Sequence, residues 1–259
     1  MKKYKLYLLD MDGTIYLGPN LFPQTPPFLQ FVKDIGAKYM FLTNNSAYST
    51  DRYVKRLHGL GLDFVKEEDF LTSTNATVLY LQENYAGKKL YALGTESFKE
   101  QLRDGGINIV DSIEDGIDAL VMGFDTELTF KKLEDACKLL PTGIDYIATH
   151  PDYVCPTEYG SVPDCGAVTE MLYMATGRRP VVIGKPEPTM IELALKAQGL
   201  EKGDAIFVGD RLYTDIASGC NAGIDTAFVL SGEGTLEDLE KSPAKPTYVL
   251  DHIGQCIVE

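Results

Sequence analysis

Short apolar runs that end in small or polar residues are the most regular feature of the chain. Four of them are YKLYLLD (4–10), KYMFLTNN (38–45), DAIFVGD (204–210) and DTAFVLSG (225–232). Apolar side chains occupy both faces of each run, which is typical of parallel strands buried beneath helices on both sides. The pattern therefore predicts a buried parallel sheet.

Stretches with helix signals lie between these runs. They open at Pro, Ser or Thr and close at Gly, which are common start and stop residues of helices. The three stretches are 26–36, 49–61 and 188–200. Because strands alternate with helices, we predict an α/β fold with a doubly wound, mainly parallel sheet.

The middle of the chain repeats the same alternation and predicts a second α/β unit. Its expected strands are 88–95, 118–124 and 145–150, and its expected helices are 96–106, 129–140 and 169–177. An irregular stretch rich in Pro and Gly, 151–168, precedes the last helix. We therefore predict a catalytic core formed by 1–77 and 179–259, with an inserted α/β cap domain at 78–178.

Composition narrows the class of protein. The chain has 259 residues, 44% of them hydrophobic, and a formal net charge of -14. Such a charge repels nucleic acids and anionic membranes, so we expect neither as a partner. The five Cys residues are scattered and form no CxxC pair, which favours reduced thiols in a cytoplasmic protein. The apolar stretch after Lys2 and Lys3 stops at Asp10, too short for a signal peptide, and no run approaches the length of a membrane helix, so we expect a soluble cytoplasmic protein.

Two acids close the first strand, where mutual repulsion and burial both cost free energy. Asp10 and Asp12 are separated by one residue and are followed by Gly13 and Thr14. A pair of carboxylates at such a place is stabilised by a bound cation. The alternative is an ordinary turn after a strand.

Other polar residues come after the remaining strands, at the edge of the sheet where open parallel sheets bind ligands. These residues are Thr43, Asn44, Lys185, Asp210 and Asp215. Taken singly, they also suit helix caps, turns or a surface lysine. Taken together, acids, a hydroxyl, amides and a lysine predict a site that binds a divalent cation and a phosphate.

The order of these residues gives a resemblance to a known family. DMDGT (10–14), LTNN (42–45), GKP (184–186) and VGDRLYTD (208–215) resemble, in order, the four motifs of the haloacid dehalogenase superfamily of phosphohydrolases. The chain is similar over essentially its whole length to the NagD/4-nitrophenylphosphatase subfamily, whose α/β cap is inserted between the second and third motifs. Two insert residues depart from the usual pattern: His150 replaces Asn, and Asp164 replaces Gly.

The resemblance implies a Mg²⁺-dependent phosphatase that works through an aspartyl-phosphate. Asp10 would be the nucleophile, and Asp12 would act as general acid and then general base. The implied metal ligands are the Asp10 carboxylate, the backbone carbonyl of Asp12 and the Asp210 carboxylate, an all-oxygen set that suits Mg²⁺.

The same resemblance implies roles for the other strand-end residues. The Thr43 hydroxyl, the Asn44 backbone N–H and Lys185 would bind the phosphate. Asp215 would orient Lys185 or the waters of the metal, with a helix N-cap as its alternative role. Arg211 is left without a role.

Substrate choice is expected to come from the insert. The segment 150–166 contains Asp152, Cys155 and Asp164, and the matching loop of the subfamily faces the active site. We expect a small phosphate monoester, such as a sugar phosphate or nucleoside monophosphate, with 4-nitrophenyl phosphate as a substrate in vitro. Asp164 would disfavour leaving groups that carry a further negative charge.

Two alternatives to a phosphatase remain open at this point. A phosphoryl transferase would use the same residues, and a non-catalytic phosphate sensor would use the fold only to bind. The presence of both Asp10 and Asp12 argues against the sensor. The oligomeric state also stays open, with a homodimer among the options.

Overall fold

The protein divides into two compact units in the computed structural model, which describes residues 1–46, 49–157 and 159–258. Unit 1 comprises Met1–Thr43, Thr50–Leu71 and Lys185–Glu259, and unit 2 comprises Asn44–Ser49 and Thr72–Gly184. The predicted insert, 78–178, lies wholly within unit 2. The assignment of the two units as core and cap stays a prediction.

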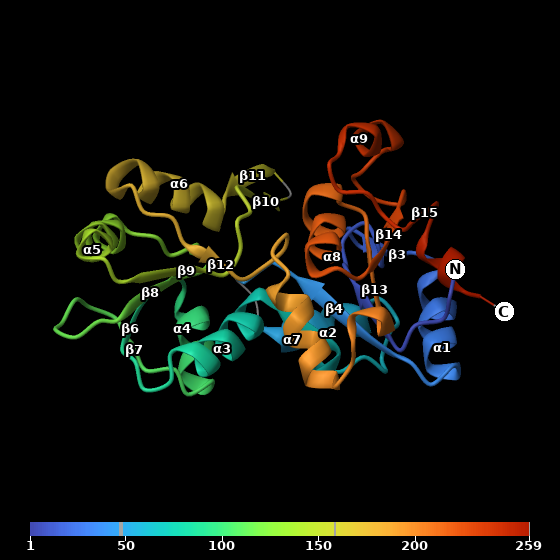
Figure 1. Cartoon of the computed structure of the whole chain (residues 1–259), viewed down its shortest axis with the longest axis horizontal. Helices are drawn as coiled ribbons and strands as arrows, with labels where there is room; N and C mark the ends of the chain where they lie inside the picture. Colours follow the sequence, from blue (N-terminus) through green and yellow to red (C-terminus); the bar gives the residue numbers. More distant parts are fainter. Residues whose placement is uncertain (47–48, 158, 259) are drawn as a thin grey trace. The chain divides into compact units, whose positions relative to one another are not determined.

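Unit 1 is built on a six-stranded sheet with the strand order β15-β14-β13-β1-β4-β5 (Figure 1). Strand β1 pairs in parallel with both β13 and β4, and β14 pairs in parallel with both β13 and β15. The strands are β1 (Leu6–Leu9), β4 (Lys38–Thr43), β5 (Phe70–Thr72), β13 (Ala205–Gly209), β14 (Asp225–Val229) and β15 (Tyr248–Leu250).

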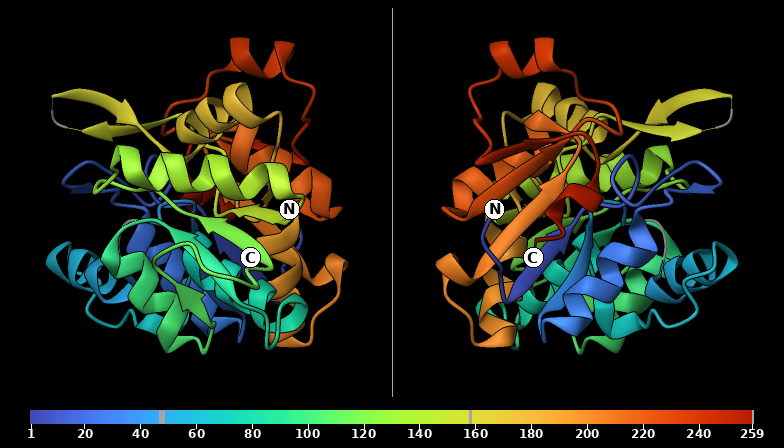
Figure 2. Two further views of the ribbon diagram at one scale, coloured as in Figure 1. Left: turned by 90° about the vertical axis from the view of Figure 1, so that its left-hand side faces the viewer. Right: turned by 90° about the vertical axis from the view of Figure 1, so that its right-hand side faces the viewer.

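Helices cover both faces of this sheet. The helices of unit 1 are α1 (Thr25–Asp34), α2 (Thr50–Gly59), α7 (Thr189–Gln198), α8 (Ala217–Ala222) and α9 (Leu236–Lys241). Tyr7 and Leu9 of β1 pack in one core with Phe28 of α1 and Leu57 of α2. Alternation along a strand turns the intervening residue, Leu8, to the opposite face. Figure 2 shows α1 in blue and the orange helices α7 and α8 on opposite sides of the sheet.

The loop after β1 adds a small antiparallel ribbon to unit 1. It consists of β2 (Tyr16–Leu17) and β3 (Asn20–Leu21). Gly13 at its start has a φ of 87°, a conformation that side chains with a Cβ rarely adopt. The glycine lets the chain turn back directly after the paired acids.

Unit 2 has a five-stranded sheet with the order β12-β9-β8-β6-β7 and parallel pairing throughout. Helices α5 and α6 pack over one face, and α3 and α4 lie on the other side (Figure 1). The elements are α3 (Ser73–Asn84), β6 (Leu90–Leu93), α4 (Glu96–Asp104), β7 (Ile109–Val110), β8 (Ala119–Met122), α5 (Phe130–Leu139), β9 (Asp145–Ala148), α6 (Cys165–Thr176) and β12 (Val181–Val182).

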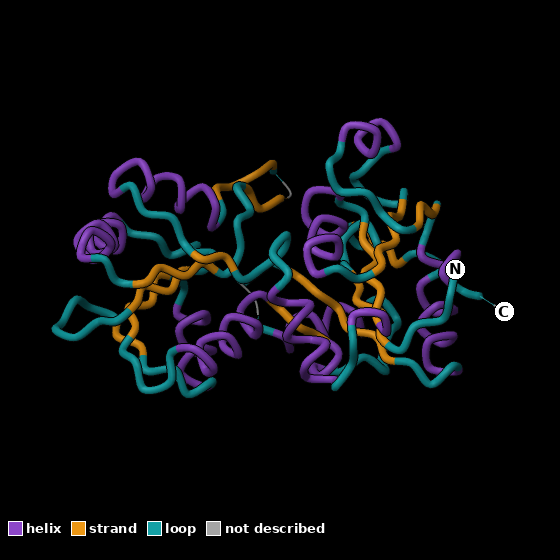
Figure 3. The backbone as a smooth tube through the Cα atoms, viewed as in Figure 1, coloured by secondary structure: helices purple, strands orange, loops and turns teal. Residues whose placement is uncertain are grey.

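The predicted α/β class with parallel sheets and helices on both sides is confirmed. The stretch predicted as irregular, 151–168, contains an antiparallel hairpin of β10 (Val154–Thr157) and β11 (Gly160–Pro163), shown in orange ahead of α6 in Figure 3. The helix predicted to start at 169 starts at Cys165, because the Asp164 side chain accepts a hydrogen bond from the Cys165 N–H and caps the helix there.

No helix within the described parts of the chain is both long enough and apolar enough to span a membrane. The five cysteines lie within the described residues, and none of them forms a disulfide.

Candidate active site

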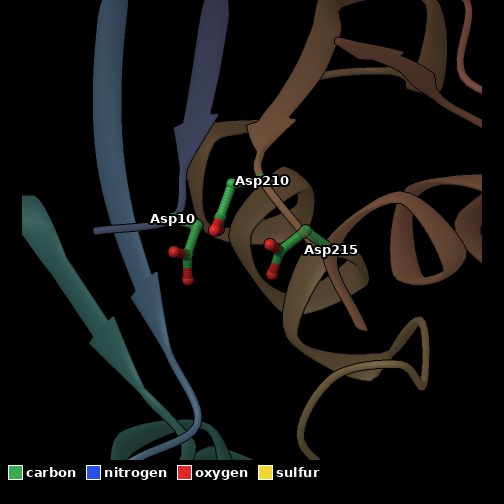
Figure 4. Close-up of side chains that lie close together, drawn as sticks. All are labelled: Asp10, Asp210 and Asp215. Carbon is green, nitrogen blue, oxygen red and sulfur yellow. The ribbon is translucent and has the colours of Figure 1, made fainter. Parts of the chain in front are cut away.

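Three carboxylates gather at the carboxyl ends of two neighbouring strands of unit 1. Asp10 follows β1, Asp210 follows β13, and Asp215 lies in the short helical turn η4 (Leu212–Ile216) (Figure 4). One side-chain oxygen of each lies within 4.8 Å of the others. We call these three acids, together with Lys185, the acid cluster.

The parallel pairing of β1 with β13 explains why residues so distant in sequence meet. Leu9 pairs with Val208, and the Asp10 N–H donates to the Val208 carbonyl at 2.9 Å. Asp10 comes directly after Leu9 and Asp210 comes two residues after Val208, so both carboxylates lie at the same edge of the sheet. Gly13 and Gly232 approach so closely that a Cβ on either would lie 2.2 Å or less from Asp210 Oδ2.

Lys185 neutralises part of this negative charge. Its Nζ donates to Asp10 Oδ1 at 2.6 Å and to Asp215 Oδ1 at 2.7 Å, and it lies 3.4 Å from the Leu42 carbonyl oxygen. The Lys185 side chain is only 5% exposed. The interpretation of Lys185 as a solvated surface lysine is therefore wrong.

Burial and nearby like charges raise the pKa values of two of the acids. Burial, followed by the nearby Asp215 carboxylate, raises the pKa of Asp10 to about 8, although Lys185 acts in the opposite direction. The same two causes raise the pKa of Asp210 to about 6. Burial lowers the pKa of Lys185, but Asp10 and Asp215 outweigh it and raise that pKa overall. One lysine leaves the three acids with excess negative charge.

Asp210 has an oxygen that suits a metal ion. Its Oδ2 accepts the Glu233 N–H at 2.7 Å, whereas its Oδ1 is buried with no hydrogen-bond partner among the residues the structure describes. An unpaired buried carboxylate oxygen is costly, and a bound cation would satisfy it. Asp10 and Asp210 could hold Mg²⁺ with oxygen ligands, and the Asp12 backbone carbonyl is the third expected protein ligand.

Asp215 is fully buried and uses both oxygens within unit 1. Oδ1 accepts from Lys185, and Oδ2 accepts the Arg211 N–H at 3.0 Å. The alternative role as the N-cap of the next helix does not fit, because the N-cap of α8 is Ile216. Asp215 accepts a hydrogen bond from Lys185, and its role in orienting that lysine stays a prediction.

Asp12 differs from Asp10 in its surroundings. Its side chain is exposed and is not part of the acid cluster. The next residue, Gly13, donates its N–H to the Tyr16 carbonyl at 2.7 Å. An exposed carboxylate two residues after a buried one suits proton exchange with a leaving group or with water.

The two predicted phosphate-binding residues at the end of β4, Thr43 and Asn44, belong to different units. Thr43 is the last residue of β4 and belongs to unit 1, whereas Asn44 is the first residue of unit 2. Asn44 is buried, and its Nδ2 lies 3.2 and 3.3 Å from the two carboxylate oxygens of Asp152. Ser73 Oγ donates to the Asn44 carbonyl at 2.5 Å.

The three predicted specificity residues have unlike environments in unit 2. Asp152 and Cys155 are half-buried, and burial raises the pKa of the Cys155 thiol. Asp164 is only 5% exposed, and its Oδ1 lies 2.9 Å from His150 Nε2 and 2.6 Å from the Cys165 backbone nitrogen. The Asp164 carboxylate is therefore buried and hydrogen-bonded, and its expected effect on charged leaving groups stays a prediction.

The sequence-based predictions missed three residues that contact the predicted site residues. Gly232 and Glu233 come shortly after β14 and pack against Asp210, and Ser73 holds Asn44. The position of Gly232 and Glu233 beyond a strand end is the same signal that identified the other site residues, and it could have found these two. Ser73 gave no comparable signal.

Comparisons with known proteins extend this picture. The family model of the haloacid dehalogenase-like hydrolases matches residues 7–108, and a HAD-hydrolase-like model matches residues 182–256. An acid sugar phosphatase of Staphylococcus aureus is 36% identical over 259 residues, which cover 100% of this chain and 99% of that protein. The chain belongs to the haloacid dehalogenase-like hydrolases.

Solved structures place this hydrolase within one group of the family. A 4-nitrophenylphosphatase from Thermotoga maritima is 38% identical with a TM-score of 0.90, covering 98% of this chain and 96% of that chain. A glycerol phosphate phosphatase from Mycobacterium tuberculosis, solved with magnesium, is 29% identical with a TM-score of 0.89, covering 99% of this chain and 77% of that chain. The protein is a phosphatase of the NagD/4-nitrophenylphosphatase group.

Proposed function

We propose that this phosphatase hydrolyses small phosphate monoesters in a Mg²⁺-dependent reaction through an aspartyl-phosphate on Asp10. The observation that carries the proposal is the acid cluster, in which three buried carboxylates lie together, Lys185 pairs with two of them, and Asp210 Oδ1 has no hydrogen-bond partner within the described chain. Mg²⁺ bound by Asp10, Asp210 and the Asp12 carbonyl would neutralise the charge between a carboxylate nucleophile and a phosphate dianion.

The first half of the reaction forms the aspartyl-phosphate. An oxygen of the Asp10 carboxylate attacks phosphorus in line, and the bond between phosphorus and the ester oxygen breaks. Asp12, in its protonated form, gives its proton to the departing alkoxide. The exposure of Asp12 supports this role, because the residue must reach the leaving group.

The second half returns the enzyme to its starting state. The Asp12 carboxylate takes a proton from water, and the resulting hydroxide attacks phosphorus and releases Asp10 with inorganic phosphate. Lys185, the Thr43 hydroxyl and the Asn44 backbone N–H bind the phosphoryl oxygens in both halves. The two hydrogen bonds of Lys185 to Asp10 and Asp215 keep its ammonium beside the nucleophile.

The proposed substrate class rests on the relatives and on the insert. Relatives named as a sugar phosphatase and a glycerol phosphate phosphatase favour small polyol or sugar phosphates over large ones. A nucleoside monophosphate remains in the proposed class, and 4-nitrophenyl phosphate is the proposed test substrate. Unit 2 would serve as the cap.

The proposed cellular setting is based on charge and thiol content. A net charge of -14 and five cysteines that form no disulfide favour a cytoplasmic enzyme without nucleic acid or membrane partners. A homodimer is kept in the proposal as a state to be measured by size-exclusion chromatography with light scattering.

The deciding experiment measures turnover of 4-nitrophenyl phosphate after removal of metal. We expect no turnover in EDTA, full recovery with Mg²⁺, and little recovery with Ca²⁺, whose larger and looser shell misplaces the nucleophile. Brief reaction followed by acid quenching and mass spectrometry should find the phosphate on the peptide that contains Asp10. Full turnover in chelator would overturn the metal dependence, and a phosphorylated residue elsewhere would overturn the mechanism.

A further inference from the structure

Asn44 is held on several sides within unit 2. Its Nδ2 faces both carboxylate oxygens of Asp152, and Ser73 Oγ donates to its backbone carbonyl. Its Oδ1 lies beside Gly184, where an added Cβ would come within 2.6 Å. A buried side chain fixed in this way has one orientation, and the direction of its backbone is fixed with it.

Asp152 is itself fixed by the start of α6. The Gly166 N–H donates to the Asp152 carbonyl at 2.8 Å, and the Asp164 N–H donates to the Tyr153 carbonyl at 3.0 Å. The Asp164 carboxylate reaches back to His150, two residues before Asp152. We call Asn44, Asp152, His150 and Asp164 the Asn44 cluster.

The two residues that depart from the usual pattern of the subfamily both belong to the Asn44 cluster. His150 and Asp164 are partners, with His150 Nε2 2.9 Å from Asp164 Oδ1, and both side chains are buried. His150 Nδ1 lies 2.8 Å from Thr149 Oγ1, so both ring nitrogens have partners. The pair connects the end of β9 to the N-terminus of α6 on either side of Asp152.

We propose that Asp152 is a positioning residue for phosphate binding, which acts by holding the Asn44 side chain and so aims the N–H of the peptide between Thr43 and Asn44. The inference rests on the proposed function, which assigns that N–H to the phosphate. The chain passes from unit 1 to unit 2 at this peptide bond, so the direction of the N–H depends on contacts made by Asn44 inside unit 2. Asp152 therefore affects every substrate equally, because all esters present the same phosphate.

This role differs from the specificity role suggested by the sequence. A residue that touches the leaving group changes the order of preference among substrates. Loss of a residue that acts on phosphate binding lowers kcat/KM for all esters by one common factor. It weakens the binding of inorganic phosphate by the same factor. The two carboxylate oxygens of Asp152 both face Asn44, which favours the second role.

The test compares Asp152→Ala, Asp152→Asn and the control Asp104→Ala, which changes an exposed aspartate at the end of α4. The measurements are kcat/KM for a panel of neutral and anionic phosphate esters, the inhibition constant of inorganic phosphate, and the melting temperature. We expect Asp152→Ala to lose about 10-fold in each kcat/KM and in phosphate affinity, the scale of a hydrogen bond to a charged group. Asp152→Asn keeps one acceptor oxygen and should lose less, and the control should match the wild type.

A double-mutant cycle with Asn44→Ala separates positioning from general damage. If Asp152 acts through the Asn44 side chain, then Asp152→Ala should change kcat/KM and phosphate inhibition by less than about 2-fold in the Asn44→Ala background. Additive losses would overturn the inference, as would a changed order of preference among the esters. An Asp152→Ala enzyme with wild-type constants would also overturn it, whereas a wild type without Mg²⁺-dependent turnover would overturn the proposed function instead.

Discussion

The acid cluster of unit 1 and the Asn44 cluster of unit 2 are both polar and largely buried, but they differ in how fully their polar atoms are paired. In the acid cluster Lys185 pairs with Asp10 and Asp215, and Asp210 Oδ1 has no hydrogen-bond partner among the described residues. In the Asn44 cluster the Asp152 carboxylate faces an amide, and the Asp164 carboxylate faces an imidazole and a backbone N–H.

This difference distinguishes a cluster that needs a ligand from one whose polar atoms already have partners within the protein. A buried cluster with crowded like charges and an unpaired oxygen costs folding free energy, and it persists where a bound ion or substrate supplies the missing partner. A cluster whose polar atoms already have partners instead fixes backbone geometry. Changes in the acid cluster should therefore affect chemistry most, and changes in the Asn44 cluster should affect geometry.

The largest effect is expected from Asp10→Asn. An amide cannot form the aspartyl-phosphate, so turnover of 4-nitrophenyl phosphate should fall by about 10⁵-fold or more. The rate is measured by absorbance under saturating Mg²⁺. Asp34→Asn, a change of an exposed aspartate at the end of α1, is the control and should leave the rate unchanged. Wild-type turnover in Asp10→Asn would remove Asp10 from the mechanism.

A smaller effect is expected from Asp12→Asn, because that residue moves protons without forming a bond to phosphorus. The loss of kcat should be about 10²–10⁴-fold for esters of poorly acidic alcohols. It should shrink for 4-nitrophenyl phosphate, whose leaving group needs no proton. Equal losses for both kinds of ester, seen in parallel rate measurements, would argue against Asp12 as the general acid.

The lysine of the acid cluster can be compared with a buried lysine of unit 2. Lys185→Met leaves Asp10 and Asp215 uncompensated and should lower the free energy of unfolding of the metal-free protein by about 3–5 kcal/mol. Lys99 is 7% exposed, but its partners Glu96 and Asp111 are 61% and 53% exposed and stay solvated without it. Lys99→Met should therefore cost only about 1 kcal/mol. Urea titrations compare the two variants, and equal losses would contradict the imbalance assigned to the acid cluster.

The acid cluster should also give the metal-free protein an unusual dependence on pH. A carboxyl whose pKa is higher in the folded chain binds more protons when folded, so stability falls as pH rises between the two pKa values. For Asp10 that window runs from its ordinary pKa of 3.8 to about 8, with Asp210 contributing up to about 6. Stability should fall by several kcal/mol across this window, because each pKa unit corresponds to about 1.4 kcal/mol.

Two controls isolate this pH effect. Mg²⁺ should flatten the dependence, because it binds the ionised carboxylates of the folded state. Asp10→Asn without metal should lose much of the slope. Melting temperatures from about pH 5 to pH 8 provide the measurement, and a wild-type slope that persists unchanged in the variant would assign the effect to other groups.

The acid cluster could be predicted from the sequence because Asp10 and Asp210 come directly after predicted strands. The run before Asp10 and the run before Asp210 identify two parallel strands, and parallel pairing brings their ends together. The contacts of Asp164 could not be predicted in the same way. Its pairing with His150 depends on how a hairpin and a helix start fold back on β9, and no periodic pattern encodes that approach.

The smallest effect is expected at the His150–Asp164 pair, and it tests what the sequence suggested for Asp164. Asp164→Gly removes the N-cap of α6 and one partner of His150, and should lower the free energy of unfolding by about 2 kcal/mol. Asp164→Asn keeps a capping oxygen and should lose less. The double variant His150→Asn/Asp164→Gly should recover part of the loss, because no imidazole is then left without its acceptor.

Catalysis should distinguish a buried pair from a charge that faces the substrate. Because the Asp164 carboxylate is 5% exposed and already has its partners, Asp164→Gly should leave the order of preference among neutral and anionic phosphate esters unchanged. Any loss in kcat/KM should be uniform, as expected if the Asn44 cluster loosens around Asp152. A selective gain for anionic esters would show instead that Asp164 repels them, and would return this residue to the specificity role that its place in the sequence suggested.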